Sequence, residues 1–376
     1  MLATYEDFRW AAKKRLPRLL FDYVDGGAYA ERTLAANVAD FAGVHLRQRV
    51  LHDVSKLETG VDLFGRRYSM PVILAPVGMA GLYAKRGEAQ AARAAAKAGV
   101  PMCLSTLSIC GLDEVSRTAP PWFQLYVLKD RGFMRELIAK AKTVGSPVLV
   151  FTVDLPTPGA RYRDVRSGLF GGGPSAGLKL ALDGITHPGW LFDVWFGGQP
   201  HCFENVVPAV GKGASFMDFW VWVRKNFDPT LTWDDLAWIK QAWGGPIVIK
   251  GILDPEDARL ACEAGVDGIV VSNHGGRQLD DALSGIRALP GVVEAVDGRA
   301  TVLMDGGVRS GLDVLKALAT GAKACLIGRS WAMALGARGE RGVFAMLANM
   351  RDELKTAMAL TGCTDVARAG PDLLVR

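Results

Sequence analysis

The chain has 376 residues, of which 49% are hydrophobic and 22% are charged, so it can bury a sizeable core. Its formal net charge of +5 is modest for this length and predicts no nucleic-acid partner. The six cysteines form no C-x-x-C pair and the histidines lack the spacing of metal ligands, so we expect a reduced, cytoplasmic protein without a metal site. No uncharged apolar stretch reaches the ~20 residues that a membrane-spanning helix needs.

The first predicted element is one amphipathic helix over Tyr5–Leu20, ahead of an alternating pattern. Short apolar runs then alternate with alanine-rich amphipathic segments. The runs predict eight strands: Val72–Ala75, Met102–Ser105, Trp122–Tyr126, Leu149–Asp154, Ile247–Gly251, Gly268–Asn273, Thr301–Asp305 and Ala324–Gly328. The amphipathic segments predict helices that include Gly87–Ala98, Gly132–Thr143, Trp233–Trp243, Pro255–Ala264 and Gly311–Thr320.

Eight apolar strands, nearly all followed by a helix, predict parallel pairing with both faces covered. The α/β class expected from this pattern is a closed (β/α)₈ TIM barrel with an N-terminal helical segment. The alternative, a doubly wound sheet, lacks its Gly-x-Gly-x-x-Gly turn after the first strand. We expect residues 1–376 to form one domain, with the barrel over about residues 70–335.

A long insertion, about residues 165–230, follows the fourth predicted strand. A helix is expected over Ser215–Arg224. The insertion either packs its aromatic side chains on the barrel or presents them to a membrane surface, where Trp and Phe are favoured. The aromatic residues are Trp190, Phe192, Trp195, Phe196, Phe216, Phe219, Trp220 and Trp222.

The last two predicted strands end in glycine and arginine, in Asp305-Gly306-Gly307-Val308-Arg309 and in Gly328-Arg329. Barrels often bind phosphate with the loops after these two strands, and glycine N–H groups with an arginine suit a phosphate oxyanion. The two segments therefore predict the phosphate site of a nucleotide cofactor, although two ordinary glycine turns would give the same pattern.

Acid–base chemistry is predicted by the segment 272–280 (SNHGGRQLD) at the end of the sixth strand. His274 is a candidate base, with Asp154 across the barrel to fix its tautomer. Arg277 and Arg161 could grip a carboxylate, unless Arg277 pairs with a neighbouring aspartate. Lys250, at the end of an apolar strand, could stabilise charge on a reduced cofactor ring or pair with Asp154.

The segment 272–280 resembles the signature of the FMN-dependent L-2-hydroxy-acid dehydrogenases and oxidases. The resemblance extends over the chain through Phe21–Ala28, Met70–Pro76, Trp122–Val127, Thr152–Asp154, Val248–Gly251 and Asp305–Arg309. Three longer stretches resemble the branch of this family that passes electrons from L-lactate to quinone in bacterial respiration: Trp122–Ile138, Phe151–Asp164 and Asn226–Ile239.

The resemblance implies a barrel that binds FMN and a small 2-hydroxy acid. Residues that match the family's FMN contacts are Pro76, Val77, Gly78, Ser105, Gln124, Thr152, Lys250, Ser272, Asp305, Gly307, Arg309, Gly328 and Arg329. The implied substrate contacts are Tyr23, Tyr126, Arg161, His274 and Arg277, and the implied catalytic set is His274, Asp154, Tyr126 and Lys250. Gly78 departs from the alanine common in the family's oxidases, which leaves more space beside the ring.

The expected reaction is oxidation of L-lactate to pyruvate, with electrons passed to a quinone-type acceptor. Two alternatives stay open, an oxidase that uses O₂ and a dehydrogenase for another acid such as mandelate or glycolate. The residues do not decide whether His274 removes the hydroxyl proton or the α-proton. The resemblance further implies a homo-oligomer. The Trp- and Phe-rich insertion separately predicts a peripheral position on the inner face of the cell membrane.

Overall fold

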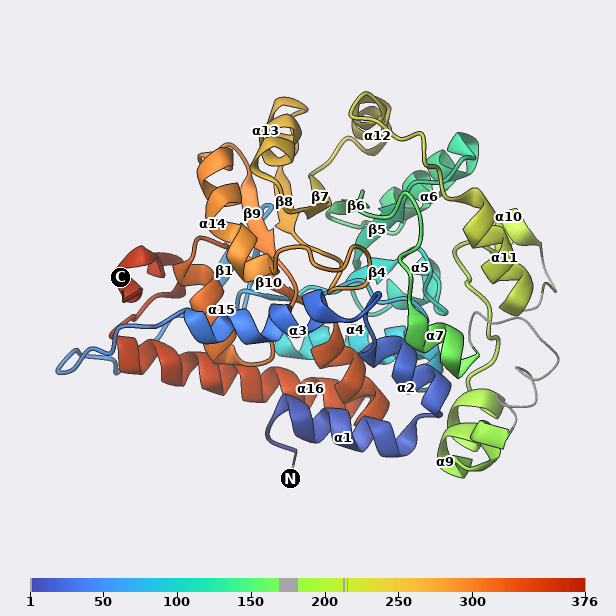
Figure 1. Ribbon diagram of the computed structural model, residues 1–376, viewed down its shortest axis with the longest axis horizontal. Coiled ribbons are helices and arrows are strands. Elements are labelled where there is room, and N and C mark those ends of the chain that lie inside the picture. The colour runs from blue at the N-terminus through green and yellow to red at the C-terminus, as the bar shows by residue number, and fades with distance from the viewer. Residues whose placement is uncertain (1, 169–181, 212–213, 215, 376) are drawn as a thin grey trace.

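The computed structural model describes residues 2–168, 182–211, 214 and 216–375, and its centre is a barrel of eight parallel strands (Figure 1). The strands pair in the order β3-β10-β9-β8-β7-β6-β5-β4, and a parallel bridge between Leu74 and Met102 joins β3 to β4. The predicted barrel is confirmed, with every predicted strand boundary within about two residues. The strands are β3 (Val72–Leu74), β4 (Cys103–Ser105), β5 (Trp122–Tyr126), β6 (Leu149–Thr152), β7 (Ile247–Ile252), β8 (Gly268–Val271), β9 (Thr301–Met304) and β10 (Ala324–Ile327).

A hairpin that the sequence analysis did not predict, β1 (Val61–Leu63) and β2 (Arg66–Tyr68), covers the amino-terminal end of the barrel. Its apolar side chains pack with inward-facing residues of the strands in one buried cluster. Trp122 Nε1, at the start of β5, donates a hydrogen bond to the Tyr68 hydroxyl at 3.3 Å. Because this end is plugged by side chains, ligands must enter from the opposite mouth, where strand-end residues of barrels usually do chemistry.

Helices surround the barrel, and a long α16 runs beneath it in Figure 1 beside α1. The backbone of α16 breaks helical geometry at Arg338 and Gly339, so two helical segments follow the last strand. The predicted helices after the strands are confirmed with small boundary changes. The surrounding helices are α4 (Gly87–Ala98), α5 (Leu112–Val115), α6 (Arg131–Thr143), α12 (Asp235–Trp243), α13 (Pro255–Glu263), α14 (Gly285–Val296), α15 (Gly311–Ala319) and α16 (Arg329–Thr361).

The N-terminal segment is helical as predicted, but the single helix over Tyr5–Leu20 is wrong. Two helices, α1 (Tyr5–Arg15) and α2 (Arg18–Asp25), meet at Pro17, whose ring and missing N–H interrupt a continuous helix. A third helix, α3 (Arg32–Ala39), packs against the loops that follow β8 and β9. The short 3₁₀ turns are η1 (Asp40–Gly43), η2 (Ala80–Leu82), η4 (Val366–Arg368) and η5 (Pro371–Leu373).

The insertion contains short helices, and its aromatic side chains divide between two environments. Trp190 and Phe219 are buried, whereas Phe192 and Phe196 are 68% and 61% exposed. The predicted helix over Ser215–Arg224 is confirmed as α11, while the side chains of Phe216 and Trp220 lie outside the described residues. The elements here are α7 (Tyr162–Ser167), α9 (Pro188–Trp190), η3 (Leu191–Phe196), α10 (Val207–Val210) and α11 (Phe216–Asn226). Over the described ranges, no helix is long and apolar enough to cross a membrane.

Candidate active site

A cavity of about 400 Å³ opens at the carboxyl ends of the strands and brings together most of the predicted site residues. Asp154, Gln124 and Ser272 are not part of its wall, but each of them contacts a side chain that is. The predicted residues that line the cavity are Tyr23, Pro76, Val77, Gly78, Ser105, Tyr126, Thr152, Arg161, Lys250, His274, Arg277, Asp305, Gly307, Arg309, Gly328 and Arg329.

His274 and Asp154 form the predicted pair, with 2.8 Å between His274 Nδ1 and Asp154 Oδ1. Burial lowers the pKa of His274 despite the opposing charge of Asp154. Burial would raise the pKa of Asp154, but His274 and Lys250 outweigh it and lower that pKa. A neutral imidazole beside a carboxylate must carry its proton on Nδ1, so Nε2 presents a lone pair as a general base requires.

The backbone at His274 is left-handed, with φ of 56°, and the next two glycines share this conformation. Such a conformation is rare and strained for a histidine. The His274 N–H donates to Ser272 Oγ at 3.0 Å, which helps to hold the turn. A Cβ on Gly276 would lie 2.6 Å from the Leu34 backbone nitrogen, so this position accepts only glycine as α3 approaches.

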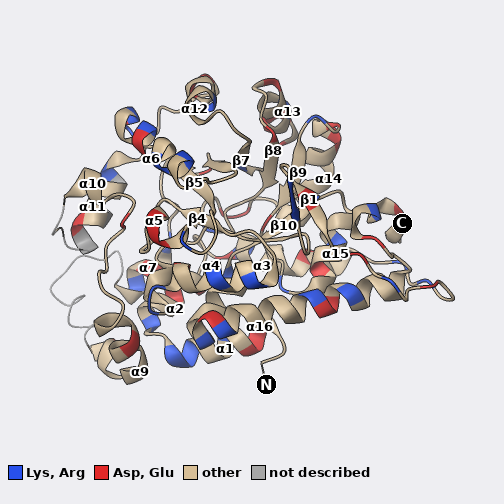
Figure 2. Cartoon of the chain, turned by 180° about the vertical axis from the view of Figure 1, so that it is seen from behind, with Lys and Arg blue, Asp and Glu red and all other residues tan. Residues whose placement is uncertain are grey.

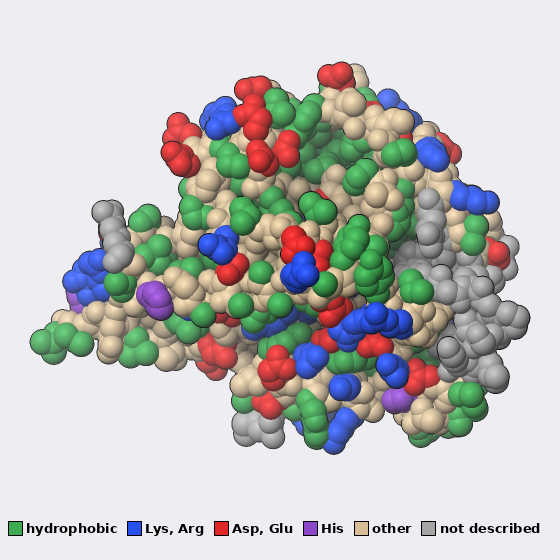
Figure 3. All heavy atoms as spheres, viewed as in Figure 1, with side chains coloured by type: hydrophobic (Ala, Val, Ile, Leu, Met, Phe, Trp, Pro, Cys, Tyr) green, Lys and Arg blue, Asp and Glu red, His purple; other side chains and the backbone are tan. Residues whose placement is uncertain are grey.

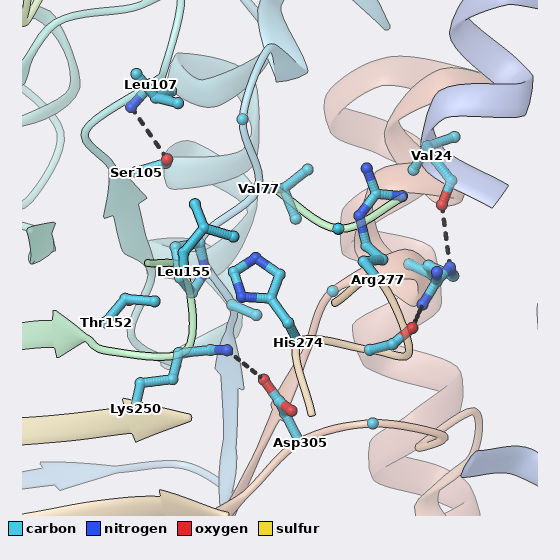
Figure 4. A pocket seen from close by; sticks show the side chains of 18 of the residues that line it. Val24, Val77, Ser105, Leu107, Thr152, Leu155, Lys250, His274, Arg277 and Asp305 are labelled. Carbon is cyan, nitrogen blue, oxygen red and sulfur yellow. Dashed lines mark hydrogen bonds and ion pairs between the residues drawn. The ribbon is translucent and has the colours of Figure 1, made fainter. Parts of the chain in front are cut away.

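Lys250 is buried at the end of β7, where its ammonium lies 3.1 Å from Asp305 Oδ2 and donates to Ser272 Oγ at 2.8 Å. Its ion-pair partner is therefore Asp305, on the loop after β9, rather than the Asp154 considered from the sequence. Burial alone would lower the pKa of Lys250, but Asp305 and Asp154 outweigh it and raise that pKa. In the view of Figure 4, this fixed cation lies on one side of the His274 imidazole and Arg277 lies on the other.

Arg161 and Arg277 approach the cavity from the loops after β6 and β8. The pairing of Arg277 with a neighbouring aspartate, considered from the sequence, does not occur. Arg277 Nη1 donates instead to the carbonyls of Tyr23 and Gly26, at 2.5 and 2.9 Å, and its guanidinium stacks on the Tyr23 ring. Burial and the charge of Arg277 lower the pKa of Arg161. Two neighbouring guanidinium groups in a half-buried cavity suit a carboxylate ligand.

Buried polar atoms around the cavity provide a test of whether FMN fits. Three of them, Gln124 Nε2, Thr152 Oγ1 and Asp305 Oδ1, have no hydrogen-bond partner within the described part of the chain. Gln124 Oε1 accepts from Ser105 Oγ at 3.2 Å, so the amide is oriented and its N–H groups remain available. Unmade hydrogen bonds at buried groups are costly, and a polar ring edge or ribityl chain would satisfy them. The donor and acceptor set therefore fits a flavin.

The phosphate site predicted after β9 requires a glycine backbone that an anion can approach closely, and this loop has one. Gly306 and Gly307 are left-handed, with φ of 87° and 86°, and both have α3 at close range. A Cβ on Gly307 would lie 1.7 Å from the Asn37 carbonyl oxygen, so helix packing alone already requires glycine there. The cationic side chain that completes this end of the cavity is Arg309, which also lies over the Tyr5 ring.

Arg329 lines the cavity and also forms hydrogen bonds to the chain segments around it. Its guanidinium donates to the carbonyls of Val24, Gly26 and Gly275, at 3.0, 2.7 and 2.8 Å. Burial, with the charges of Arg277 and Arg309, lowers its pKa to about 9. The structural contribution of this arginine was not foreseen from the sequence.

Several apolar residues of the cavity were also missed: Tyr83, Leu107, Leu155, Val165 and Phe227. Leu107 and Leu155 follow predicted strand ends closely and could have been found from that position. Phe227 comes from the far end of the insertion, and its ring meets Tyr126 edge-on at 5.5 Å between centroids. Phe227 is far along the chain from the other cavity residues, and nothing in the sequence indicates that its ring lies there.

One mouth of the closed barrel holds a histidine oriented by an aspartate, a buried lysine and two arginines. This arrangement defines a cofactor-dependent enzyme that acts on small acids. The sequence profile of the FMN-dependent dehydrogenases matches residues 12–376. The chain belongs to that family, and it is an FMN-dependent dehydrogenase.

Two relatives and two solved structures illustrate the similarity. The chain is 57% identical to an L-lactate dehydrogenase of Caulobacter vibrioides over 376 residues, which is 100% of this chain and 98% of the relative. An L-lactate dehydrogenase of Xanthomonas campestris pv. campestris is 53% identical over 378 residues, which is 100% of this chain and 97% of the relative. The structure of a monotopic membrane protein, (S)-mandelate dehydrogenase, superposes with a TM-score of 0.93 at 35% identity, covering 100% and 99% of the two chains. The structure of a mandelate oxidase with (S)-2-phenylpropionate superposes with a TM-score of 0.83 at 38% identity. The match covers 98% of this chain and 97% of the oxidase chain.

Proposed function

We propose that the protein oxidises L-lactate to pyruvate and passes the two electrons to a quinone-type acceptor. The observation that supports this most is the convergence of His274–Asp154 and Arg161–Arg277 on one small cavity. The 57% identity to an L-lactate dehydrogenase supports the choice of acid. FMN, when bound, supplies a ring that accepts two electrons and releases them to a second acceptor.

In this proposal each charged side chain has a separate task. Arg161 and Arg277 bind the substrate carboxylate, while Tyr23 and Tyr126 hold the hydroxyl end. His274 Nε2 accepts one proton from the substrate, and Asp154 stabilises the resulting imidazolium through Nδ1–H. Lys250, kept charged by Asp305, stabilises negative charge that develops on the bound ring. Base catalysis of this kind contributes roughly 10²–10⁴-fold to the rate.

The test is an absorbance spectrum of the purified protein before and after anaerobic addition of L-lactate. We expect flavin absorption that is lost on adding L-lactate and retained with D-lactate. Return of the absorption on adding a soluble quinone, faster than on adding air, would support the quinone-type acceptor. A colourless protein that takes up no flavin, or a yellow one that L-lactate does not bleach, would contradict the proposal.

A second candidate is a dehydrogenase for a larger 2-hydroxy acid such as mandelate. The specific observation in its favour is Gly78, where a Cβ would lie 3.7 Å from the Tyr23 hydroxyl and 3.3 Å from the Leu107 carbonyl oxygen. Glycine at this point leaves space next to a proposed substrate contact. Comparison of kcat/KM for lactate, glycolate and mandelate separates the candidates, and preference for mandelate would favour the second.

We further propose peripheral attachment to a membrane through an aromatic patch, defined as Trp10, Leu182, Ile185, Phe192 and Phe196. All five side chains are more than half exposed. They come from α1 and from the 182–196 segment, which an ion pair between Arg15 and Asp193 joins at 2.6 Å. Figures 1 and 2 both place α1 and α9 at the same edge, and Figure 3 shows basic, acidic and hydrophobic side chains along it. Aromatic rings with nearby cations suit an anionic lipid surface.

A further inference from the structure

One amide side chain joins the two loops that carry the charged residues of the cavity. Gln278, after β8, donates from Nε2 to the carbonyl of Asp154 at 2.8 Å and to the carbonyl of Thr157 at 2.9 Å. Its Oε1 accepts from the Gly159 N–H at 3.1 Å. A single side chain thus holds three backbone groups of the loop between β6 and α7.

The same two loops are also in direct backbone contact. Arg161 Nε donates to the Arg277 carbonyl at 3.2 Å. A Cβ on Gly159 would lie 2.4 Å from that carbonyl oxygen and 2.9 Å from Gln278 Cα, so only glycine allows this approach. Gln278 and these contacts therefore hold the two loops against each other.

The position of these contacts matters because they lie between two pairs of side chains. Asp154, whose carbonyl accepts from Gln278, holds His274 through its carboxylate at 2.8 Å. Arg161, at the other end of the loop, lies beside Arg277. The residues from Val153 to Arg161 form neither helix nor strand, so their geometry depends on such side-chain contacts.

We propose that Gln278 is a positioning residue that sets the distance between the His274–Asp154 pair and the Arg161–Arg277 pair. This inference rests on the proposed function, in which one pair binds the carboxylate and the other takes a proton. In a 2-hydroxy acid the carboxylate and the reacting carbon are bonded directly, so the spacing of the two pairs has little tolerance. A misplacement of about 1 Å can cost roughly 10²-fold in rate.

The experiment compares Gln278→Met, which removes all three hydrogen bonds, with Gln278→Glu, which keeps the acceptor and removes both donors. Leu279→Ala is the matched control, because its side chain is 68% exposed and makes none of these contacts. Each protein is loaded with FMN, and its thermal unfolding is recorded. Flavin reduction by L-lactate is then followed in single turnovers over a range of pH.

We expect both Gln278 variants to retain FMN and to reduce it roughly 10²-fold more slowly, with Leu279→Ala unchanged. In Gln278→Met, which adds no charge, the acid limb of the pH profile should move to lower pH, because a displaced Asp154 no longer raises the pKa of His274. A merely structural role would lower the unfolding temperature without moving this limb. Reduction within twofold of the wild type at every pH would overturn the inference.

Binding of oxalate, followed by the change that it causes in the flavin spectrum, tests the arginine side without turnover. Weaker oxalate binding in both Gln278 variants supports the inference, and unchanged affinity contradicts it. If the wild-type flavin is not reduced by any 2-hydroxy acid, the proposed function fails. The oxalate comparison would still decide whether Gln278 positions the two arginines.

Discussion

The loops at the mouth of the barrel and the short helices of the insertion are held in different ways. At the mouth, side chains bind backbone groups of neighbouring loops, as Gln278 and Arg329 do. In the insertion, the residues near 182–204 are held by buried apolar side chains such as Trp190 and by the ion pairs Arg86–Glu204 and Arg15–Asp193. The mouth buries its charged groups, whereas the insertion leaves Phe192 and Phe196 exposed.

This difference separates two requirements of the proposed function. A proton transfer needs atoms held to within a few tenths of an ångström, which a network of buried backbone hydrogen bonds provides. Attachment to a lipid surface needs exposed apolar area and positive charge, without an exact geometry. Substitutions at the mouth should therefore slow flavin reduction and leave membrane attachment unchanged. Substitutions in the aromatic patch should weaken attachment and leave flavin reduction unchanged.

The largest effect is expected for His274→Ala. Loss of the base should slow flavin reduction by L-lactate by roughly 10²–10⁴-fold. The visible spectrum should remain that of bound flavin, because His274 is not among the residues proposed to bind the cofactor. Stopped-flow absorbance under anaerobic conditions measures both properties. Rapid reduction in this variant would remove His274 from the proposed mechanism.

An intermediate effect is expected for Asp154→Asn, together with a shift in pH dependence. In the wild type, reduction requires neutral His274, so the rate should rise with pH through a pKa below the ordinary histidine value. Because Asp154 raises that pKa, its neutralisation should move the acid limb further down. The rate on the plateau should fall roughly 10–100-fold, as for loss of other partners that orient a histidine. A shift of the acid limb to higher pH would contradict the conclusion that Asp154 raises the pKa of His274.

The smallest effect on chemistry is expected for Phe192→Ser combined with Phe196→Ser. Flavin reduction should stay within about twofold of the wild type, since neither ring lines the cavity. Partition onto vesicles with anionic lipid should fall, because each ring transferred from water is worth about 2 kcal/mol. Leu360→Ser, at a 56% exposed apolar position on α16, is the matched control. Equal vesicle binding by all three proteins would exclude the aromatic patch as the attachment surface.

Much of the fold could be predicted because each barrel strand is a short apolar run followed by an amphipathic helix. The strands are buried on both faces, so their composition identified them almost residue by residue. The hairpin of β1 and β2 escaped prediction because exposed charged residues, Asp62 in β1 and Arg66 and Arg67 in β2, interrupt its apolar pattern. The break at Pro17 was readable in principle, since proline interrupts a helix interior.

The sequence by itself determined which residue types stand at the strand ends, and the barrel rule then placed them at one mouth. It therefore determined the eight-stranded barrel and the charged residues of its cavity. The sequence also predicted the His274–Asp154 pair, but only the tertiary structure decided that Lys250 pairs with Asp305 and that Arg277 binds backbone carbonyls. The tertiary structure alone showed that Gln278 joins the loops after β6 and β8, and that α3 requires glycine at 276 and 307. These choices depend on distances between segments far apart along the chain, which local patterns of polarity and size do not contain.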